Sequence, residues 1–396
     1  MPTAVPFTIA IAESRLSWIQ DRVRAFPWDS VPDAGGWGAG MAKDTLRRIV
    51  DHWANGYDWR AEEAALNGLP QFRAETDQGR LHFVHLRSQA GATRLPILLL
   101  HGWPGSFAEF RDVAPRLAHP ERFGGTAADA FDLVIPSLPG FAFSDKLRAP
   151  IGARTIAGMM HHLMTRTLGY EHYIVQGGDW GSAIGSWIAH DYPQACIGLH
   201  LNMAILSHGG ARAETEAEKA YRAEQARSRD SEGAYAQLQR TKPQTLGFAL
   251  EDSPVGAAAW MLEKFVAWSD LPHVDGTPDL EAVHSIDRLL TNVMLYVATG
   301  SMTTSTWIYL GNTHDNAVLL EHPVTTPTAV AAFPDPVFSP PPRSLAEKSY
   351  NIVRWTPMPR GGHFAAMEQP QAFAADLRTF AETIAAPPKA GTHPSP

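Results

Sequence analysis

The chain has 396 residues, of which 44% are hydrophobic and 19% are charged, and its formal net charge at pH 7 is −8. The charges are not gathered in blocks, and no stripe of Lys and Arg could neutralise a phosphate backbone, so we expect no nucleic-acid partner. The single cysteine, Cys196, excludes an internal disulfide framework, and no run of roughly 18 apolar residues occurs; we expect a cytoplasmic protein without a membrane anchor.

Short apolar runs from residue 95 onward predict a sheet. Before them, residues 1–90 are too irregular for an independent domain and end in an alternating run, 81–86, typical of a half-buried strand. The later runs are continuous and separated by helical stretches such as 155–168, which indicates parallel strands buried on both faces. The predicted strands are 95–100, 131–136, 170–175, 196–201, 328–333 and 350–355. The pattern predicts an α/β fold with a mostly parallel central sheet flanked by helices.

A helical stretch interrupts the predicted strands after residue 201 and indicates an inserted cap. Within it, residues 214–239 carry Glu and Arg or Lys at helical spacing, which is typical of a solvent-facing helix. The composition after residue 385 is typical of a disordered end. We therefore predict these segments: an N-terminal extension (1–90), the first part of the core (91–205), a helical cap (206–326), the second part of the core (327–385) and a disordered tail (386–396).

Asp179 lies in the run 175–182, Val-Gln-Gly-Gly-Asp-Trp-Gly-Ser, where a strand-like segment meets a helix-like one. Gly177 and Gly181 supply the small residues of a sharp strand-to-helix turn, and the run resembles the nucleophile elbow of the α/β-hydrolase fold with Asp in place of Ser. A carboxylate that attacks an ester would form a high-energy anhydride, whereas its attack on a saturated carbon gives an alkyl ester that water can cleave. Asp179 therefore indicates a nucleophile for epoxides or alkyl halides.

His363 follows the last predicted strand in the run Arg-Gly-Gly-His-Phe-Ala, where the same fold places its base. A neutral imidazole accepts a proton from water, and the ordinary histidine pKa of about 6.5 makes this the major form at pH 7. A second carboxylate would orient the ring. We choose Asp335, just after a predicted strand, and keep Asp315 and Glu321 as alternatives.

The run His101-Gly-Trp-Pro-Gly-Ser106 follows the first buried strand, where the α/β-hydrolase fold builds an oxyanion donor. We expect the backbone N–H groups of Trp103 and Trp180 to hold the oxyanion that forms when water attacks the ester. His101 itself is interpreted as structural.

Opening an epoxide leaves an alkoxide, which needs a positioned acid. Tyrosine suits this role because its ordinary pKa of about 10 keeps it protonated at pH 7. The predicted cap supplies Tyr235 and Tyr309 as candidates, although sequence periodicity cannot bring these two side chains to one pocket.

Together, these motifs resemble those of the microsomal-type epoxide hydrolases over nearly the whole chain. The matching runs are Tyr57-Asp-Trp-Arg60, Leu66-Asn67, Pro70-Gln-Phe72, His82-Phe-Val-His85, His101-Gly-Trp-Pro104, Gly178-Asp-Trp-Gly-Ser182 and Gly361-Gly-His-Phe-Ala365. The resemblance implies an extension that wraps the core, and it places Tyr235 and Tyr309 as the pair that activates the epoxide. It implies hydrolysis of a small epoxide, apolar or aromatic, to a vicinal diol through an ester at Asp179, in a detoxifying role and without a metal or organic cofactor. A homo-oligomer is compatible with the sequence.

Two positions depart from the family pattern. Relatives carry the acid after Phe-Pro-x, but Asp335 follows Pro334 directly, and Ala142 stands where relatives often have glycine. A haloalkane dehalogenase shares the Asp nucleophile and His base but requires halide-binding N–H donors; the tyrosine pair and the extension favour the epoxide. A non-catalytic ligand-binding member of the fold is a second alternative, against which the set of Asp179, His363 and an acid argues.

Overall fold

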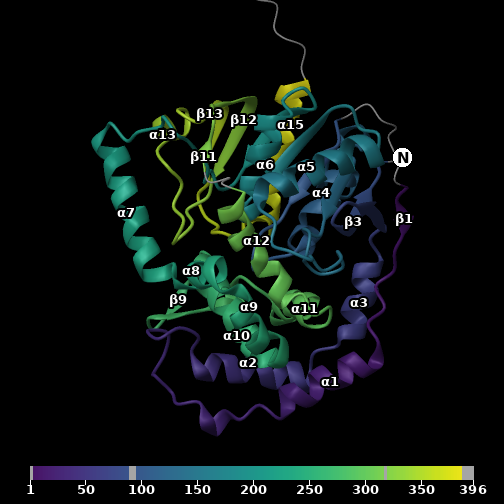
Figure 1. The fold of residues 1–396 in the computed structure, drawn as a ribbon, viewed down its shortest axis with the longest axis vertical. Helices are drawn as coiled ribbons and strands as arrows, with labels where there is room; N and C mark the ends of the chain where they lie inside the picture. Colours follow the sequence, from purple (N-terminus) through teal and green to yellow (C-terminus); the bar gives the residue numbers. More distant parts are fainter. Residues whose placement is uncertain (1–2, 89–94, 316–318, 386–396) are drawn as a thin grey trace, which may run out of the picture.

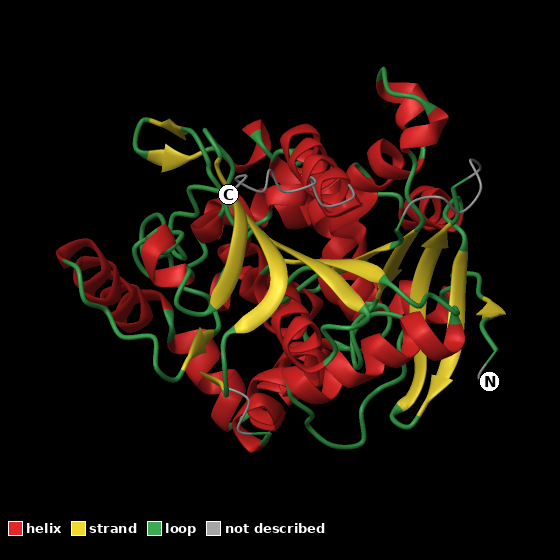
Figure 2. Ribbon diagram, turned by 90° about the horizontal axis from the view of Figure 1, so that it is seen from above, coloured by secondary structure: helices red, strands yellow, loops and turns green. Residues whose placement is uncertain are grey.

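The computed structural model describes residues 3–88, 95–315 and 319–385, and in these ranges the main feature is a 9-stranded twisted sheet with helices on both faces (Figures 1 and 2). The strand order is β1-β2-β3-β5-β4-β6-β7-β12-β13. The strands are β1 (Val5–Pro6), β2 (Gln71–Thr76), β3 (Gly79–Leu86), β4 (Ile97–Leu100), β5 (Leu133–Pro136), β6 (Tyr173–Gly177), β7 (Cys196–Leu201), β12 (Val324–Ala332) and β13 (Tyr350–Pro357).

The strands from β5 to β13 pair in parallel, and β1, β2 and β3 add an antiparallel edge next to β5. Every residue of β4, β5 and β6 is buried, as the continuous apolar runs predicted. Helices α5 (Ala153–His162) and α6 (Asp179–Asp191) pack against each other, and α4 (Val113–Ala118) packs against α15 (Pro370–Ala385). The predicted α/β class with a mostly parallel sheet is therefore confirmed.

One predicted strand begins in the wrong place. The sequence suggested a strand from residue 328, but β12 already starts at Val324, and its register against β13 shifts between Val324 and Pro327. Proline has no N–H for the sheet, so its presence argues against a strand by pattern alone. The shift in register lets the strand include Pro327.

The helices between β7 and β12 lie between the core and the N-terminal extension (Figure 1). The main ones are α7 (Glu216–Glu232), α8 (Ala234–Thr241), α9 (Pro243–Asp252), α10 (Pro254–Trp268), α11 (Ile286–Val297) and α12 (Met302–His314). The predicted solvent-facing helix over 214–239 is two helices, α7 and α8. Helix α7 is largely exposed, as its charge pattern predicted, except for the buried Glu218, which accepts hydrogen bonds from Ser344 and Lys348. For α8 the prediction is wrong, because Tyr235 stacks on Trp103 and Gln239 accepts a hydrogen bond from Trp260, and both are buried. The predicted segment boundaries stay a prediction, and the predicted disordered tail lies outside the described residues.

The extension contributes helices α1 (Glu13–Arg24), α2 (Lys43–Asn55) and α3 (Trp59–Asn67). In Figure 1, α1 and α2 run below the cap helices, and α3 lies beside α11. Polar contacts join the extension to α11. Tyr57 and Thr291 share a hydrogen bond of 3.0 Å between their hydroxyl groups, and His52 Nε2 lies 2.6 Å from Asp287 Oδ1. The extension therefore braces the cap from the side that faces away from the sheet.

Among the residues that the structure describes, no helix combines the length and the apolar character that a membrane crossing requires.

A buried carboxylate joins α15 to the sheet. Asp376, 4% exposed, accepts hydrogen bonds from Arg354 Nε at 2.8 Å and Thr356 Oγ1 at 2.7 Å, and its Oδ2 lies 3.2 Å from His200 Nε2. Burial opposes the charged form, but the contacts with His200, Arg354 and Thr356 outweigh it and lower the pKa of Asp376 to about 2. This network ties β7 and β13 to one helix.

We predict that Asp376→Asn lowers the free energy of unfolding by about 3 kcal/mol, because it removes the buried negative charge to which Arg354 and Thr356 donate hydrogen bonds. Urea denaturation at pH 7 measures the loss. The exposed Asp230→Asn serves as the matched control and should change stability by less than about 0.5 kcal/mol.

The pH dependence has a defined sign. A folded-state pKa below the ordinary value of about 3.9 means that the contribution of Asp376 is fully present above that value and is lost as the pH falls through about 2. The stability difference between wild type and Asp376→Asn should therefore shrink in acid, and a constant difference down to that range would contradict this assignment.

Candidate active site

Asp179 occupies a strained turn between β6 and α6. Its φ of +49° lies in the left-handed region that non-glycine residues rarely adopt. The turn is possible because glycines surround it: a Cβ at Gly177 would overlap the backbone of Gly181, and a Cβ at Gly181 would overlap the backbone oxygen of Leu100. The predicted elbow is therefore present as a geometry, with its carboxylate raised above the end of the sheet.

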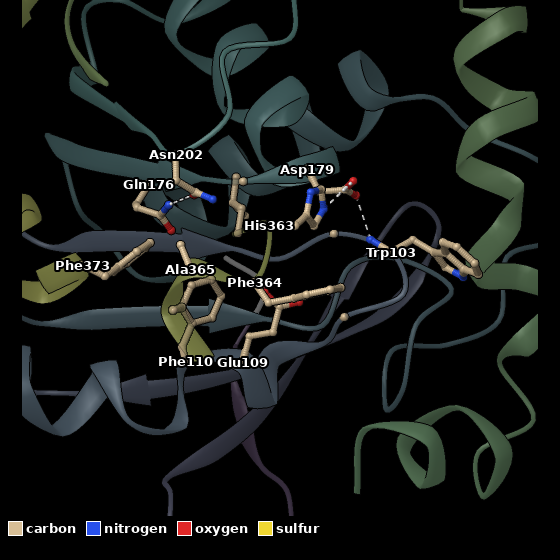
Figure 3. Close-up of a pocket in the computed structure, with 15 residues that line it drawn as sticks. Trp103, Glu109, Phe110, Gln176, Asp179, Asn202, His363, Phe364, Ala365 and Phe373 are labelled. Carbon is tan, nitrogen blue, oxygen red and sulfur yellow. Dashed lines mark hydrogen bonds and ion pairs between the residues drawn. The ribbon is translucent and has the colours of Figure 1, made fainter. Parts of the chain in front are cut away.

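Two neighbours hold the Asp179 carboxylate. The backbone N–H of Trp103 donates to Oδ1 at 2.9 Å, and His363 Nε2 lies 3.3 Å from Oδ2 (Figure 3). Gly102 makes this approach possible, because a Cβ there would occupy the position of the carboxylate. The loop predicted to supply an oxyanion donor thus contacts the predicted nucleophile directly.

His363 lies between two carboxylates. Its Nδ1 is 2.8 Å from Asp335 Oδ2, while the other oxygen of Asp335 accepts hydrogen bonds from the backbone N–H groups of Val337 and Phe338 at 2.9 and 2.8 Å. Of the three acids considered from the sequence, Asp335 is the one beside His363. Its position directly after Pro334 does not displace it from the histidine.

The two alternative acids serve other contacts. Asp315 accepts hydrogen bonds from the backbone N–H of Gly152 and the hydroxyl of Thr155, and Glu321 pairs with Arg154 at 2.5 Å. Both sets of contacts lie at the start of α5 rather than at His363.

The charge on His363 differs from the sequence expectation. Burial alone would lower the pKa of the imidazole, but the interactions with Asp179 and Asp335 outweigh burial and raise its pKa to about 10. In the free protein the ring is therefore an imidazolium at pH 7, not the neutral form that its ordinary pKa predicts. The ring becomes a base only when one of the two negative charges is removed.

Tyr235 and Tyr309, from α8 and α12, meet above Asp179. Their ring centroids are 6.0 Å apart, and the ring of Tyr235 stacks on that of Trp103 at 5.4 Å. Tyr309 packs edge-on against the ring of Trp180 at 4.8 Å. Burial, with the nearby charge of Asp179, raises the pKa of both phenols well above the ordinary value, so both hydroxyl groups are protonated at neutral pH.

A cavity of about 290 Å³ joins the two tyrosines to Asp179. Its wall is largely apolar, and α7 adds the longer side chains of Tyr221, Arg222, Gln225 and Arg229. The remaining lining residues are Trp180, Asn202, Met203, Ala204, Ile205, Val330, Phe338, Ser339, Pro340 and Pro341. The site therefore combines a carboxylate, two phenols and space for a small organic molecule.

His101 has a structural position, as interpreted from the sequence. Its Nε2 accepts a hydrogen bond from the backbone N–H of Leu138 at 3.1 Å, so its Nδ1 carries the proton and donates to the backbone oxygen of Gly102 at 2.9 Å. Burial lowers the pKa of His101 to about 4 and keeps it neutral. It thereby holds the loop that carries Trp103. The predicted role of the Trp180 amide stays a prediction.

The sequence did not predict that Trp268, Gln176 and Glu109 would lie at the site. The backbone oxygen of Trp268 accepts from the His363 N–H at 2.9 Å, and the Trp268 ring lies 4.8 Å from the imidazole. Nothing in the spacing of the cap indicates this. Gln176 and Glu109 also lie beside Asp179 and His363. The pattern Ser106-x-x-Glu109 is a helix-start signature, which predicts a local turn but not its place at the site.

We predict that Gly102→Ala lowers kcat about 100-fold or more, because the new methyl group displaces the Asp179 carboxylate and such misplacement of a reacting group has this order of effect. Steady-state hydrolysis of styrene oxide measures it. Gly209→Ala, where a Cβ meets nothing within 4 Å, is the matched control and should retain full activity. Equal rates in both variants would contradict the positioning of Asp179 by this loop.

Comparison with known proteins identifies the family of this chain. The family model described as epoxide hydrolase N terminus matches residues 4–110, and the model described as alpha/beta hydrolase fold matches residues 96–250. Epoxide hydrolase 1 of Sus scrofa is 33% identical, with 95% of this chain and 88% of that protein covered. Juvenile hormone epoxide hydrolase 2 of Ctenocephalides felis is 36% identical, with 94% and 84% covered.

The crystal structure of juvenile hormone epoxide hydrolase from the silkworm Bombyx mori has a TM-score of 0.86 and 32% sequence identity, and the match covers 97% of this chain and 95% of that chain. Both the resemblance read from the motifs and the α/β-hydrolase fold are thereby confirmed. The chain belongs to the microsomal-type epoxide hydrolases and is an epoxide hydrolase with the N-terminal domain of that family.

Proposed function

We propose that this enzyme converts an epoxide and water to a vicinal diol in two steps, through an ester on Asp179. The observation that carries the proposal is the Asp179 carboxylate in the lining of the 290 Å³ cavity, with the Trp103 amide on Oδ1 and the phenols of Tyr235 and Tyr309 in the same lining. An oxirane placed between the phenols and the carboxylate meets a nucleophile on its carbon and acids on its oxygen.

In the first step, Asp179 Oδ2 attacks an epoxide carbon, and the carbon–oxygen bond breaks. Tyr235 and Tyr309 donate hydrogen bonds to the oxygen that leaves the carbon, and one phenol gives it a proton. Their raised pKa values keep both phenols protonated until that charge develops. The product is a hydroxyalkyl ester of Asp179.

The second step, hydrolysis of the ester, becomes possible because the first step removes the negative charge of Asp179. Esterification neutralises Asp179, so one of the two carboxylates that raise the pKa of His363 is lost. The ring then gives up its proton, which returns to the tyrosinate, and becomes a base for water, still oriented by Asp335. The Trp103 amide, with Trp180 as the second proposed donor, holds the oxyanion as the ester is cleaved.

The cavity supports an apolar or aromatic epoxide as the substrate. Met203, Ile205, Val330 and Phe338 contribute apolar side chains, and the rings of Trp180 and the tyrosines offer flat surfaces.

A single turnover with excess enzyme in oxygen-18 water tests the covalent route. Since the first diol takes its new oxygen from Asp179, we expect unlabelled diol and oxygen-18 in the Asp179 peptide, both measured by mass spectrometry. Labelled diol with an unlabelled peptide would mean direct hydration and would overturn the proposal.

Replacing the base should trap the ester. We predict that His363→Gln still forms the adduct on Asp179 but hydrolyses it at least about 100-fold more slowly, because general-base catalysis contributes 10²–10⁴-fold. Mass analysis of the intact protein after mixing with styrene oxide shows the added mass. Asp179→Asn, checked for reversion by deamidation, is the control and should show no adduct.

Loss of the phenols should slow the first step instead. We predict that Tyr235→Phe and Tyr309→Phe each lower the rate of ester formation about 100-fold, as expected when one donor to a developing oxyanion is removed. Tyr221→Phe, which changes another tyrosine of the same cavity wall, is the matched control and should react normally. Fast ester formation in the double Phe variant would exclude the role of the pair.

A further inference from the structure

A second cavity borders Asp179, separate from the one that contains the tyrosines. It measures about 20 Å³ and is lined by His363, Glu109, Gln176 and Phe364 among others, while neither tyrosine reaches it. Asp179 and Asn202 line both cavities. The nucleophile therefore stands in a wall between a large cavity for an organic molecule and a small one.

The small cavity has the size and the polar groups of a water site. A space of roughly 10–15 Å³ admits one water molecule, and a buried water typically makes about three hydrogen bonds. Gln176 Oε1 is buried and has no hydrogen-bond partner within the described residues, and His363 Nε2 has only the carboxylate of Asp179, at 3.3 Å. Gln176, fully buried, keeps its orientation by donating from Nε2 to Asn202 Oδ1 at 2.9 Å.

Glu109 brings a carboxyl group to the same cavity (Figure 3). Its Oε1 packs against Gly105, where a Cβ would overlap it, and the backbone N–H of Ser106 donates to its carboxyl group. Burial raises the pKa of Glu109 to about 8, while the positive charge of His363 lowers it and the negative charge of Asp179 raises it. The epoxide-opening step gives this half-buried acid no role.

We propose that the small cavity holds the hydrolytic water and that Glu109 binds this water through a carboxyl oxygen. This rests on the ester at Asp179 proposed above. One O–H of the water donates to Glu109 and the other to His363 Nε2, which leaves a lone pair for the carbonyl carbon of the ester.

As the water oxygen bonds to that carbon, its proton passes to His363. The bond between that carbon and Oδ2 of Asp179 then breaks, and the proton on His363 goes to Oδ2. The diol leaves with Oδ2, and the water oxygen remains in the restored Asp179 carboxylate. The water approaches from the side that the bound alkyl group does not occupy. Glu109 is thus a water-binding residue of the second step only.

The test separates the two steps in Glu109→Leu and Glu109→Met, which keep the buried volume but offer no oxygen acceptor. We expect ester formation at the wild-type rate, ester hydrolysis about 10-fold slower or more, and accumulation of the Asp179 adduct at steady state. Rapid-quench mass spectrometry measures both rates. Glu109→Gln retains an oxygen acceptor and should recover most of the hydrolysis rate.

Glu62→Leu is the matched control, because Glu62 pairs with Arg111 near Glu109 but lines neither cavity; both of its rates should stay normal. If Glu109→Leu or Glu109→Met folds and hydrolyses the ester at the wild-type rate, the proposed water site is wrong. It is also wrong if ester formation and ester hydrolysis slow by the same factor. If the adduct forms in His363→Gln but does not accumulate in the Glu109 variants, the role of Glu109 is rejected and the ester on Asp179 is retained. The absence of any adduct in both rejects the covalent route itself.

Discussion

The contact between Asp179 and His363 is the interaction on which the rest of the site depends. An aspartate with φ of +49° is strained, at a cost on the order of 1–3 kcal/mol, and persists only where its surroundings determine it. Those surroundings are the glycines of the elbow, the Trp103 amide and the imidazolium of His363. Because His363 is in turn bound to Asp335, the parts of the core before and after the cap are joined at one carboxylate.

The cap and the extension determine where the phenols stand. Tyr235 of α8 stacks on the ring of Trp103, and the backbone N–H of Trp103 donates to Asp179. Trp103 therefore connects the position of α8 to that of the Asp179 carboxylate. Asn292 of α11 donates to the backbone oxygen of Pro104 in the same loop at 2.7 Å, and α11 also contacts the extension through Thr291. The extension thus acts on the site indirectly, since it contacts α11, and α11 contacts the loop that carries Trp103.

The sequence predicted those elements whose residue pattern lies within one short segment. Strands buried on both faces leave continuous apolar runs, and an elbow requires glycines at fixed positions, so β7 and Asp179 were recognisable without coordinates. Ala142 shows the limit of such rules: it stands where relatives often have glycine, and it adopts φ of +42° nonetheless, with its N–H donating to Ser301. Contacts across the chain left no local signal. Trp268 reaches His363 from the cap, and Glu109 follows an ordinary helix-start pattern, so neither position was predictable from spacing.

An enzyme that forms an ester and then hydrolyses it must keep water available without letting it replace the epoxide. The structure divides the surroundings of Asp179 accordingly: the tyrosines and apolar side chains line one cavity, and His363, Glu109 and Gln176 line the other. In the free enzyme the negative charge of Asp179 keeps His363 protonated, so water is not activated before the substrate has reacted. In the mechanism proposed above, esterification removes that charge and thereby makes His363 a base for the second step. The order of the two proposed steps thus follows from the electrostatic contacts of His363 with Asp179 and Asp335.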